Sequence, residues 1–339
     1  VPMTQPRTRP NQPKRTVSII GTGSYLPEKI LTNQELEKLV ETSDDWITSR
    51  TGIKERRIAA EGEHTSDLAA KAALSAMENA GITAEEVDLI IVATVTPDMF
   101  FPSTACLLQN KLGAKNAACF DVVAACAGSL YALTIVDKFI RAGACKKALV
   151  IGVETMTSIT NWTDRNTCVL FGDAAGALVV DASDGTAGVL DSAIYADGTG
   201  WQHLLIPAGG SKTRLTQELL DKNADTIAMN GREVYKIAVR SLVDASEKIL
   251  AKNGLTASDV KLVVAHQANI RIIEAVAERV KIPMDKFVIN IDRYGNTSSA
   301  SAPAPFDVAR QAGRMKPGDS VLMLAIGAGM CWSAILYRA

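Results

Sequence analysis

Long apolar runs are missing from this sequence of 339 residues, and histidine is scarce. No segment approaches the roughly 18 consecutive apolar residues that a membrane helix needs, and the first residues lack the apolar stretch of a secretory signal. Three histidines without paired ligand spacing argue against a zinc site. The 36 basic and 37 acidic residues nearly cancel, so the total charge does not favour a nucleic-acid partner. We therefore expect a soluble protein with no metal, no membrane and no nucleic acid.

Closely spaced cysteine pairs are absent as well. The six cysteines are scattered without CxxC spacing through a chain that is 47% hydrophobic, so a large core does not require disulfides. We expect reduced thiols, which suit a cytoplasmic protein. Residues 1–15 carry four basic residues among four prolines and show no periodic apolar pattern, which is typical of a disordered tail.

The rest of the chain contains what looks like two copies of one unit. Residues 81–93 (GITAEEVDLIIVA) are similar to residues 254–266 (GLTASDVKLVVAH), 173 positions later. The segment ALVIG at 148–152 matches VLMLA at 321–325 with the same offset. Any two strand–helix units can look alike, but matches that share one offset favour a duplication.

Amphipathic helical patterns precede the two copies, at about residues 65–79 and 232–253. Strands that alternate with such helices predict a layered α/β fold with much of the sheet parallel. We place the two halves at residues 16–185 and 186–339. No proline- or serine-rich linker separates them, so we expect them to pack together around a shared site.

Cys126 is the candidate nucleophile. An apolar, strand-like stretch from residue 118 runs into small residues around Cys126 and then into an amphipathic helix that Gly143 is placed to end. A strand-to-helix turn presents free N–H groups and the positive end of the helix dipole, which predicts a lowered thiol pKa and half of an oxyanion hole. The alternative is a small buried core residue, which fits Cys119 better.

His266 and Asn296 are the candidate partners of this thiol. His266 directly follows a predicted strand, and ligands bind at the carboxyl ends of strands in open α/β sheets. Asn296 lies in a turn of small polar residues after the strand-like segment FVINI at 287–291. It holds nearly the place in the second copy that Cys126 holds in the first, so the duplication would bring both residues to the interface between the halves.

A glycine-rich segment, IGAGMCW at 326–332, follows the predicted strand VLMLA. Glycines let backbone N–H groups approach a ligand, so this loop could complete the oxyanion hole. The segment lies too near the end of the sequence to open a dinucleotide-binding unit.

Four motifs together resemble β-ketoacyl-acyl carrier protein synthase III, a family of thiolase fold. They are AACAGS around Cys126, HQANIR from His266, GNTSSAS from Asn296 and GAGMCW near the end, and the similarity extends over almost everything from residue 17 onward. The resemblance implies two pseudo-duplicated βαβαβαββ halves that form a five-layered α-β-α-β-α core.

In that family the cysteine takes an acyl group from acyl-CoA. Malonyl-acyl carrier protein then loses carbon dioxide, and the resulting carbanion attacks the acyl-enzyme. The resemblance therefore implies an acyltransferase that starts fatty acid biosynthesis from a short acyl-CoA primer and needs no cofactor. The expected primer is acetyl-CoA. By motif match Cys126 would be the nucleophile, and neutral His266 and Asn296 would donate hydrogen bonds to the thioester oxygen. Decarboxylation itself generates the carbanion, so no base is needed for that step.

The same resemblance implies where coenzyme A binds. The segment TSDDWITSRTGI at 42–53 is similar to the stretch in which a tryptophan stacks on adenine and an arginine contacts phosphate. A capped helix start with a buried tryptophan is the alternative. The expected contacts with coenzyme A are Thr42, Trp46, Arg50, Arg165 and Asn269.

Further expectations concern partners and chain length. Lys236, Arg271 and Arg279 match positions that face the acidic carrier protein, although by charge pattern alone they are solvated helix faces. Phe101 matches a residue that reaches across a homodimer interface into the acyl pocket. Met330 stands where the family usually has phenylalanine, which leaves the shape of the acyl pocket open.

Three rival functions are compatible with parts of this pattern. A thiolase would use Cys331 as a second thiol, but the pairing of His266 with Asn296 suits decarboxylation. A relative in secondary metabolism would use the same three residues on another acceptor. A binding module without catalysis is opposed by the presence of all three side chains.

Overall fold

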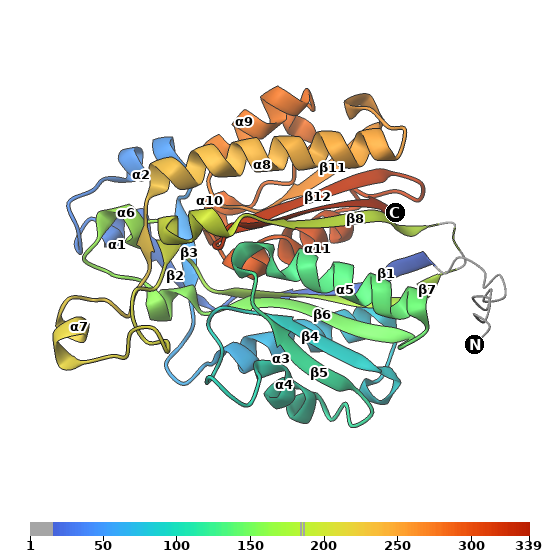
Figure 1. Cartoon of the computed structure of the whole chain (residues 1–339), viewed down its shortest axis with the longest axis horizontal. Coiled ribbons are helices and arrows are strands. Elements are labelled where there is room, and N and C mark those ends of the chain that lie inside the picture. Colours follow the sequence, from blue (N-terminus) through green and yellow to red (C-terminus); the bar gives the residue numbers. More distant parts are fainter. Residues whose placement is uncertain (1–15, 184, 186) are drawn as a thin grey trace, which may run out of the picture.

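The computed structural model describes residues 16–183, 185 and 187–339. The tail expected at residues 1–15 lies outside these described residues. Over the described part the chain forms two large sheets, with helices above, below and between them, and two small sheets of two strands each (Figure 1).

The sheet of the first half has the order β1-β7-β6-β4-β5. Strand β4 pairs in parallel with β5 and β6, whereas β7 runs antiparallel to β1 and β6. Every residue of β4 is buried, as its continuous apolar sequence predicts for a strand covered on both faces. The strands are β1 (Thr16–Tyr25), β4 (Leu89–Ala93), β5 (Ala118–Val122), β6 (Lys147–Glu154) and β7 (Ala174–Ser183).

The sheet of the second half repeats this arrangement in the order β8-β13-β12-β11. Its parallel pair is β11 with β12, and β13 is antiparallel to β12 and β8. Strands β6 and β12 start and end 173 residues apart, which is the offset predicted from the sequence. The strands are β8 (Gly188–Ala196), β11 (Val260–Ala265), β12 (Ser320–Gly327) and β13 (Cys331–Arg338).

The strand expected at residues 287–291 is reduced to one isolated bridge between Phe287 and Val263. The side chain of Gln267 explains this difference. Its Nε2 donates to the Val288 carbonyl oxygen at 3.0 Å, and its Oε1 accepts from the Asn290 N–H at 3.1 Å. The Gln267 side chain thus forms the hydrogen bonds that a neighbouring strand would form with these backbone groups in a longer β-strand.

Five layers result from the way the helices cover the two sheets (Figure 1). Helices α3 (Thr65–Ala80) and α4 (Thr104–Leu112) cover the outer face of the first sheet, and α8 (Gly231–Lys252) and α9 (Ile270–Val280) cover the outer face of the second. Helices α5 (Gly128–Ala142) and α11 (Pro303–Gln311) lie between the sheets, where one apolar cluster joins both halves. The predicted five-layered α/β fold is confirmed.

Shorter elements connect these layers. The short strands and helices are β2 (Lys29–Thr32), α1 (Asn33–Leu36), α2 (Asp44–Thr51), β3 (Glu55–Ile58), α6 (Arg165–Cys168), β9 (Leu204–Leu205), α7 (Gln217–Asp221), β10 (Ala228–Met229) and α10 (Ile291–Tyr294). The 3₁₀ turns are Ala84–Glu86, Ala125–Ala127, Met156–Ile159, Gly198–His203, Ala257–Asp259, Met284–Lys286 and Ser298–Ser301. None of the helices in the described ranges is long and apolar enough to span a membrane.

Local sequence sets the ends of α5, the helix that starts beside Cys126. Gly143 takes the left-handed conformation with φ of 77°, and its N–H donates to the Ile140 carbonyl oxygen. The predicted end of this helix is therefore confirmed. The boundary expected between residues 185 and 186 falls between β7 and β8, and we keep that division of the chain as a proposal.

Candidate active site

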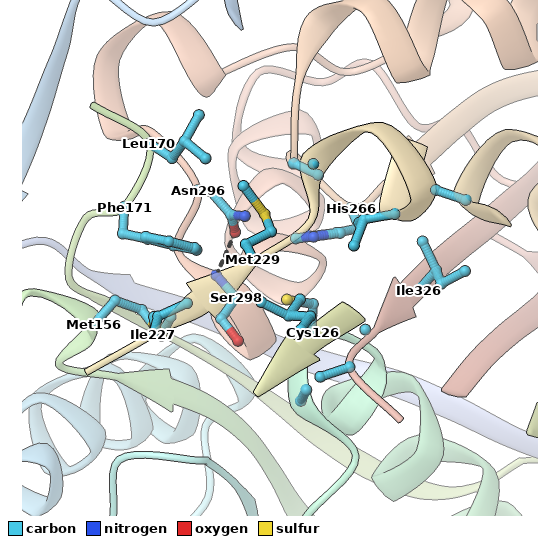
Figure 2. Close-up of a pocket in the computed structure, with 18 of the residues that line it drawn as sticks. Cys126, Met156, Leu170, Phe171, Ile227, Met229, His266, Asn296, Ser298 and Ile326 are labelled. Atoms are coloured by element: carbon cyan, nitrogen blue, oxygen red, sulfur yellow. Dashed lines mark hydrogen bonds between the residues drawn. The ribbon is translucent and has the colours of Figure 1, made fainter. Parts of the chain in front are cut away.

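The carboxyl ends of parallel strands from both sheets converge on one cavity of about 390 Å³. Cys126 follows β5 and His266 follows β11, while Asn296 lies just after α10. All three side chains line the cavity, and Figure 2 shows them turned toward one another. The structure thus brings together the three residues that the sequence singled out. Much of the remaining wall is apolar, with Met156, Phe171 and Ile227 among its side chains.

Cys126 lies in the 3₁₀ turn between β5 and α5 and is 6% exposed. Gly327 packs directly against its backbone: a Cβ atom at that glycine would lie 2.5 Å from the Cys126 nitrogen. Burial raises the pKa of the Cys126 thiol to about 12; a hydrogen bond with Ser298 lowers it, and the nearby Glu154 carboxylate raises it. The lowered pKa expected from the helix N-terminus is wrong for the resting thiol, because loss of water outweighs the dipole.

His266 is held as a neutral imidazole. Its backbone N–H donates to the Leu324 carbonyl oxygen at 2.7 Å, and its Nδ1 is hydrogen bonded to the Ser301 hydroxyl. Burial lowers the pKa of the ring to about 3, so it carries no charge near pH 7. Because Nδ1 is engaged, Nε2 is the nitrogen that remains for a ligand.

Ser301 controls which nitrogen of His266 carries the hydrogen. The Ser301 hydroxyl also lies 2.6 Å from the carbonyl oxygen of Ser298 and has one hydrogen to donate. If Ser301 donates to Nδ1, Nε2 of the neutral ring is a donor; if it donates to Ser298, Nε2 is an acceptor.

Asn296 is oriented through its side-chain oxygen. Its backbone N–H donates to the Leu170 carbonyl oxygen at 2.8 Å, and its Oδ1 accepts from the Ser298 N–H at 2.9 Å (Figure 2). With Oδ1 engaged, the Nδ2 group is the part of the amide available to donate to a ligand.

Sequence reasoning missed Ser298, which lines the cavity, Glu154, which is hydrogen bonded to Ser298, and Ser301, which is hydrogen bonded to His266. Glu154 is fully buried, and the Ser298 hydroxyl donates to its Oε1 at 3.1 Å. Burial raises the pKa of the Glu154 carboxyl group. One signal was present: the apolar strand KALVIGVE ends in a charged residue at the edge where Cys126 and His266 also lie.

A second, open cavity of about 1070 Å³ carries residues expected to contact coenzyme A. Trp46 and Arg50 line it, and Asn269 lines both cavities. The Arg50 guanidinium carbon lies 5.0 Å from the centre of the Trp46 ring, and that of Arg165 lies 4.8 Å away. Thr42 lines neither cavity in the described part of the chain.

The other predicted site residues are divided between the cavity wall and the surface. Met330 is 1% exposed and lines the cavity beside Cys126, whereas Phe101 is 84% exposed and does not line the described cavity of its own chain. Arg271 and Arg279 are exposed on α9, and Arg271 lines the second cavity. Lys236 is exposed on α8 and forms an ion pair with Glu233 at 2.7 Å.

The remaining cysteines and acidic side chains provide neither a second thiol in the cavity nor a metal site within the described residues. Cys331 does not line the described cavity; it lies near Tyr131 and packs against the central core. All six cysteines are free. Over residues 16–183, 185 and 187–339, no group of three or more histidine, cysteine and acidic side chains is placed to hold a metal ion.

Comparison with known proteins identifies the family. The model of 3-oxoacyl-[acyl-carrier-protein] synthase III matches residues 120–198, and the model of its C-terminal part matches residues 250–339. A β-ketoacyl-[acyl-carrier-protein] synthase III from Caldanaerobacter subterraneus is 53% identical over 325 residues, which are 96% of this chain and 98% of the relative. The chain belongs to the β-ketoacyl-[acyl-carrier-protein] synthase III family.

Solved structures agree with this assignment. The 3-oxoacyl-[acyl-carrier-protein] synthase III from Aquifex aeolicus superposes with a TM-score of 0.88 at 47% identity, covering 95% of this chain and all of the other. The priming β-ketosynthase of the R1128 polyketide pathway superposes with a TM-score of 0.89 at 33% identity, covering 98% of this chain and 99% of the other. The family and the thiolase-like fold predicted from the motifs are confirmed.

Proposed function

We propose that this synthase III joins a short acyl group from acyl-CoA to malonyl-acyl carrier protein, with acetyl-CoA as the preferred primer. The products would be 3-oxoacyl-acyl carrier protein, coenzyme A and carbon dioxide, which begins fatty acid biosynthesis. One observation carries the proposal: Cys126, His266 and Asn296 line a buried cavity that shares Asn269 with the open cavity at Trp46 and Arg50. Relatives with about half of their residues identical carry the name of this activity.

In the first half-reaction Cys126 would be the nucleophile. Its sulfur attacks the carbonyl carbon of the acyl thioester, the new S–C bond forms, and the bond to the coenzyme A sulfur breaks. Cys126 and Gly327 lie against each other on the cavity wall, and the backbone N–H of Cys126 would donate to the acyl oxygen. The product of this step is an acyl group held as a thioester on Cys126.

In the second half-reaction His266 and Asn296 would act on the malonyl thioester. Loss of carbon dioxide leaves an electron pair on the α-carbon and negative charge on the thioester oxygen. The Nε2–H of a neutral His266 and the Nδ2 group of Asn296 would donate hydrogen bonds to that oxygen, and both side chains are almost completely buried, where such bonds are strong. The carbanion then attacks the acyl carbon, and the Cys126 thiolate leaves.

Coenzyme A and the carrier protein would enter from the open cavity. Arg50 and Arg165 both contact Trp46, an arrangement that supports stacking on adenine and contact with phosphate. For the acidic carrier protein we propose Arg271 first, because it is exposed at the open cavity, with Arg279 on the same helix. Lys236 contributes less net charge because Glu233 pairs with it. The reaction needs no cofactor beyond the thioester substrates.

We further propose a homodimer in the cytoplasm. Phe100 and Phe101 are 88% and 84% exposed, and Val123, directly after β5, is 78% exposed. Strand β5 is the edge strand of its sheet, and an open edge beside exposed apolar side chains is suited to a second copy. Phe101 from that copy would then reach the acyl cavity. The six free thiols are compatible with a reducing compartment.

A second candidate is a condensing enzyme of secondary metabolism. The similarity to the R1128 priming ketosynthase supports it, but the higher identity to relatives named synthase III favours the first candidate. The position of Cys331, away from the cavity and against Tyr131, disfavours a thiolase.

Condensation assays test the proposal. Purified protein would be given malonyl-acyl carrier protein with acetyl-, isobutyryl- or octanoyl-CoA, and carbon dioxide and the 3-oxoacyl product would be measured. We expect product with at least one primer and none with Cys126→Ala. Absence of product with every primer would reject the synthase and favour the second candidate.

A further inference from the structure

Glu154 is a buried carboxyl group that the mechanism above leaves unused. Its Oε2 accepts four hydrogen bonds, from Thr94, Val95 and Thr96, at distances between 2.7 and 3.2 Å. These donors fix the orientation of the carboxyl group. Its other oxygen, Oε1, faces the Ser298 hydroxyl at 3.1 Å and is therefore the atom placed to exchange a hydrogen.

Ser298 joins this carboxyl group to the nucleophile. Its hydroxyl donates to Oε1 of Glu154, and Ser298 lines the same cavity as Cys126, where it lowers the pKa of the Cys126 thiol. Its backbone has a φ of 48°, a left-handed conformation that residues other than glycine seldom adopt. The backbone is held there by the bond from its N–H to Oδ1 of Asn296. Strained backbone of this kind is typical of functional sites.

We propose that Glu154 receives, through Ser298, the proton that Cys126 loses when it attacks the acyl thioester. The proton moves from Sγ to the Ser298 oxygen while the Ser298 hydrogen moves to Oε1 of Glu154. The sulfur lone pair forms the S–C bond, and the pair of the broken bond leaves on the coenzyme A sulfur, which is protonated by solvent. Glu154 keeps its proton during the acyl-enzyme stage and returns it when condensation expels the Cys126 thiolate.

Charge balance favours this path. A thiolate formed next to an ionised Glu154 would place two negative charges in a buried site, and that repulsion is one reason why the thiol resists ionisation. Transfer through Ser298 never places more than one negative charge on Cys126 and Glu154 together. Burial also raises the pKa of Glu154, which makes it a better proton acceptor near neutral pH. Because it acts through Ser298, Glu154 is a positioning residue.

The test is the pH dependence of Cys126 reactivity in Glu154→Gln. This inference rests on the proposed function, so two reagents are used, acetyl-CoA and iodoacetamide, and modification of the Cys126 peptide is followed by mass spectrometry. In wild type, both rates should rise with pH and level off once Glu154 is ionised. In Glu154→Gln the rates should no longer level off with rising pH, and acetylation of Cys126 at pH 7 should slow about 100-fold. A variant that keeps the plateau and reacts within about threefold of wild type would overturn the proposal.

Two controls separate the relay from general damage. Ser298→Ala removes the hydroxyl through which the proton would pass but leaves the bonds of Glu154 to residues 94–96. The rates of this variant should therefore also show no plateau with pH. If they do show one, the proposal fails, and this result does not depend on whether Glu154→Gln folds. Asp173→Asn alters another fully buried carboxyl group, bonded to Ala59 and Thr157, and should keep the plateau. If wild type reacts with iodoacetamide in this pattern but never with acyl-CoA, the relay stands and the proposed function fails.

Discussion

Replacing Asn296 with alanine removes one of the two side chains that we expect to hold the thioester oxygen while the malonyl group loses carbon dioxide. Loss of one donor from such a site costs about 10²–10³ in rate, or roughly 2.7–4 kcal/mol of transition-state stabilisation. The upper part of this range is expected here because Asn296 is 7% exposed, so water has little access to replace the lost Nδ2 group. The substitution also removes the bond from the Ser298 N–H to Oδ1.

The assay separates the two halves of the reaction. Carbon dioxide release from malonyl-acyl carrier protein should fall by the stated factor, while the rate at which acetyl-CoA acylates Cys126 should change little. Asn296→Asp is the matched variant, because it keeps an oxygen to accept from Ser298 but places a carboxylate oxygen where Nδ2 was. It should release carbon dioxide more slowly still. The reasoning is refuted if either variant decarboxylates within about threefold of wild type.

Four further predictions follow from other parts of the structure. Phe306→Ala should lower the free energy of unfolding in urea by about 3–5 kcal/mol, because this ring is 1% exposed between the two sheets and packs edge-on to Tyr337; a loss below about 1 kcal/mol would contradict that packing. Trp46→Ala should raise the KM for acetyl-CoA about tenfold and leave kcat nearly unchanged, because it removes the ring on which we expect adenine to stack, a contact worth about 0.5–1.5 kcal/mol beyond the area it buries. A drop confined to kcat would exclude adenine stacking. The pKa of His266 falls from 6.5 to about 3 on folding, so between these pH values the unfolded chain binds a proton that the native protein does not. The free energy of unfolding, measured in urea, should therefore decline as pH falls from about 6.5 toward 3, and it should decline less steeply in His266→Gln. Equal declines in wild type and variant would refute the lowered pKa of His266. Nitrogen NMR of protein with labelled histidine should place the hydrogen of His266 on Nε2 with Ser301 donating to Nδ1, and a spectrum with the hydrogen on Nδ1 would remove its role as a donor.

The layered fold could be predicted because its signals are local and repeated. The apolar runs that became β6 and β12 share one offset, and His266 could be placed at a strand end from the pattern alone. The strand expected at residues 287–291 could not be corrected from sequence, because the groups that replace its ladder come from Gln267, a side chain in another segment.

The three proposed catalytic side chains were found from sequence, but their setting was not. The pKa of Cys126 depends on how completely both halves exclude water, and the helix dipole argument did not include that exclusion. Ser298 is bonded to Asn296 and Glu154 and shares a cavity with Cys126 only because segments that are distant in sequence meet between the two sheets. A serine two residues after Asn296 carries no sequence signal of this role.

Direct observation of the acyl-enzyme tests the central claim that Cys126 carries the acyl group. The protein would be incubated briefly with acetyl-CoA, without malonyl-acyl carrier protein, and its intact mass and peptide masses would be measured. The account predicts a mass gain of one acetyl group located on the Cys126 peptide, lost on adding malonyl-acyl carrier protein and never formed in Cys126→Ala. An acetyl group on another residue, or condensation that proceeds in Cys126→Ala, would contradict it.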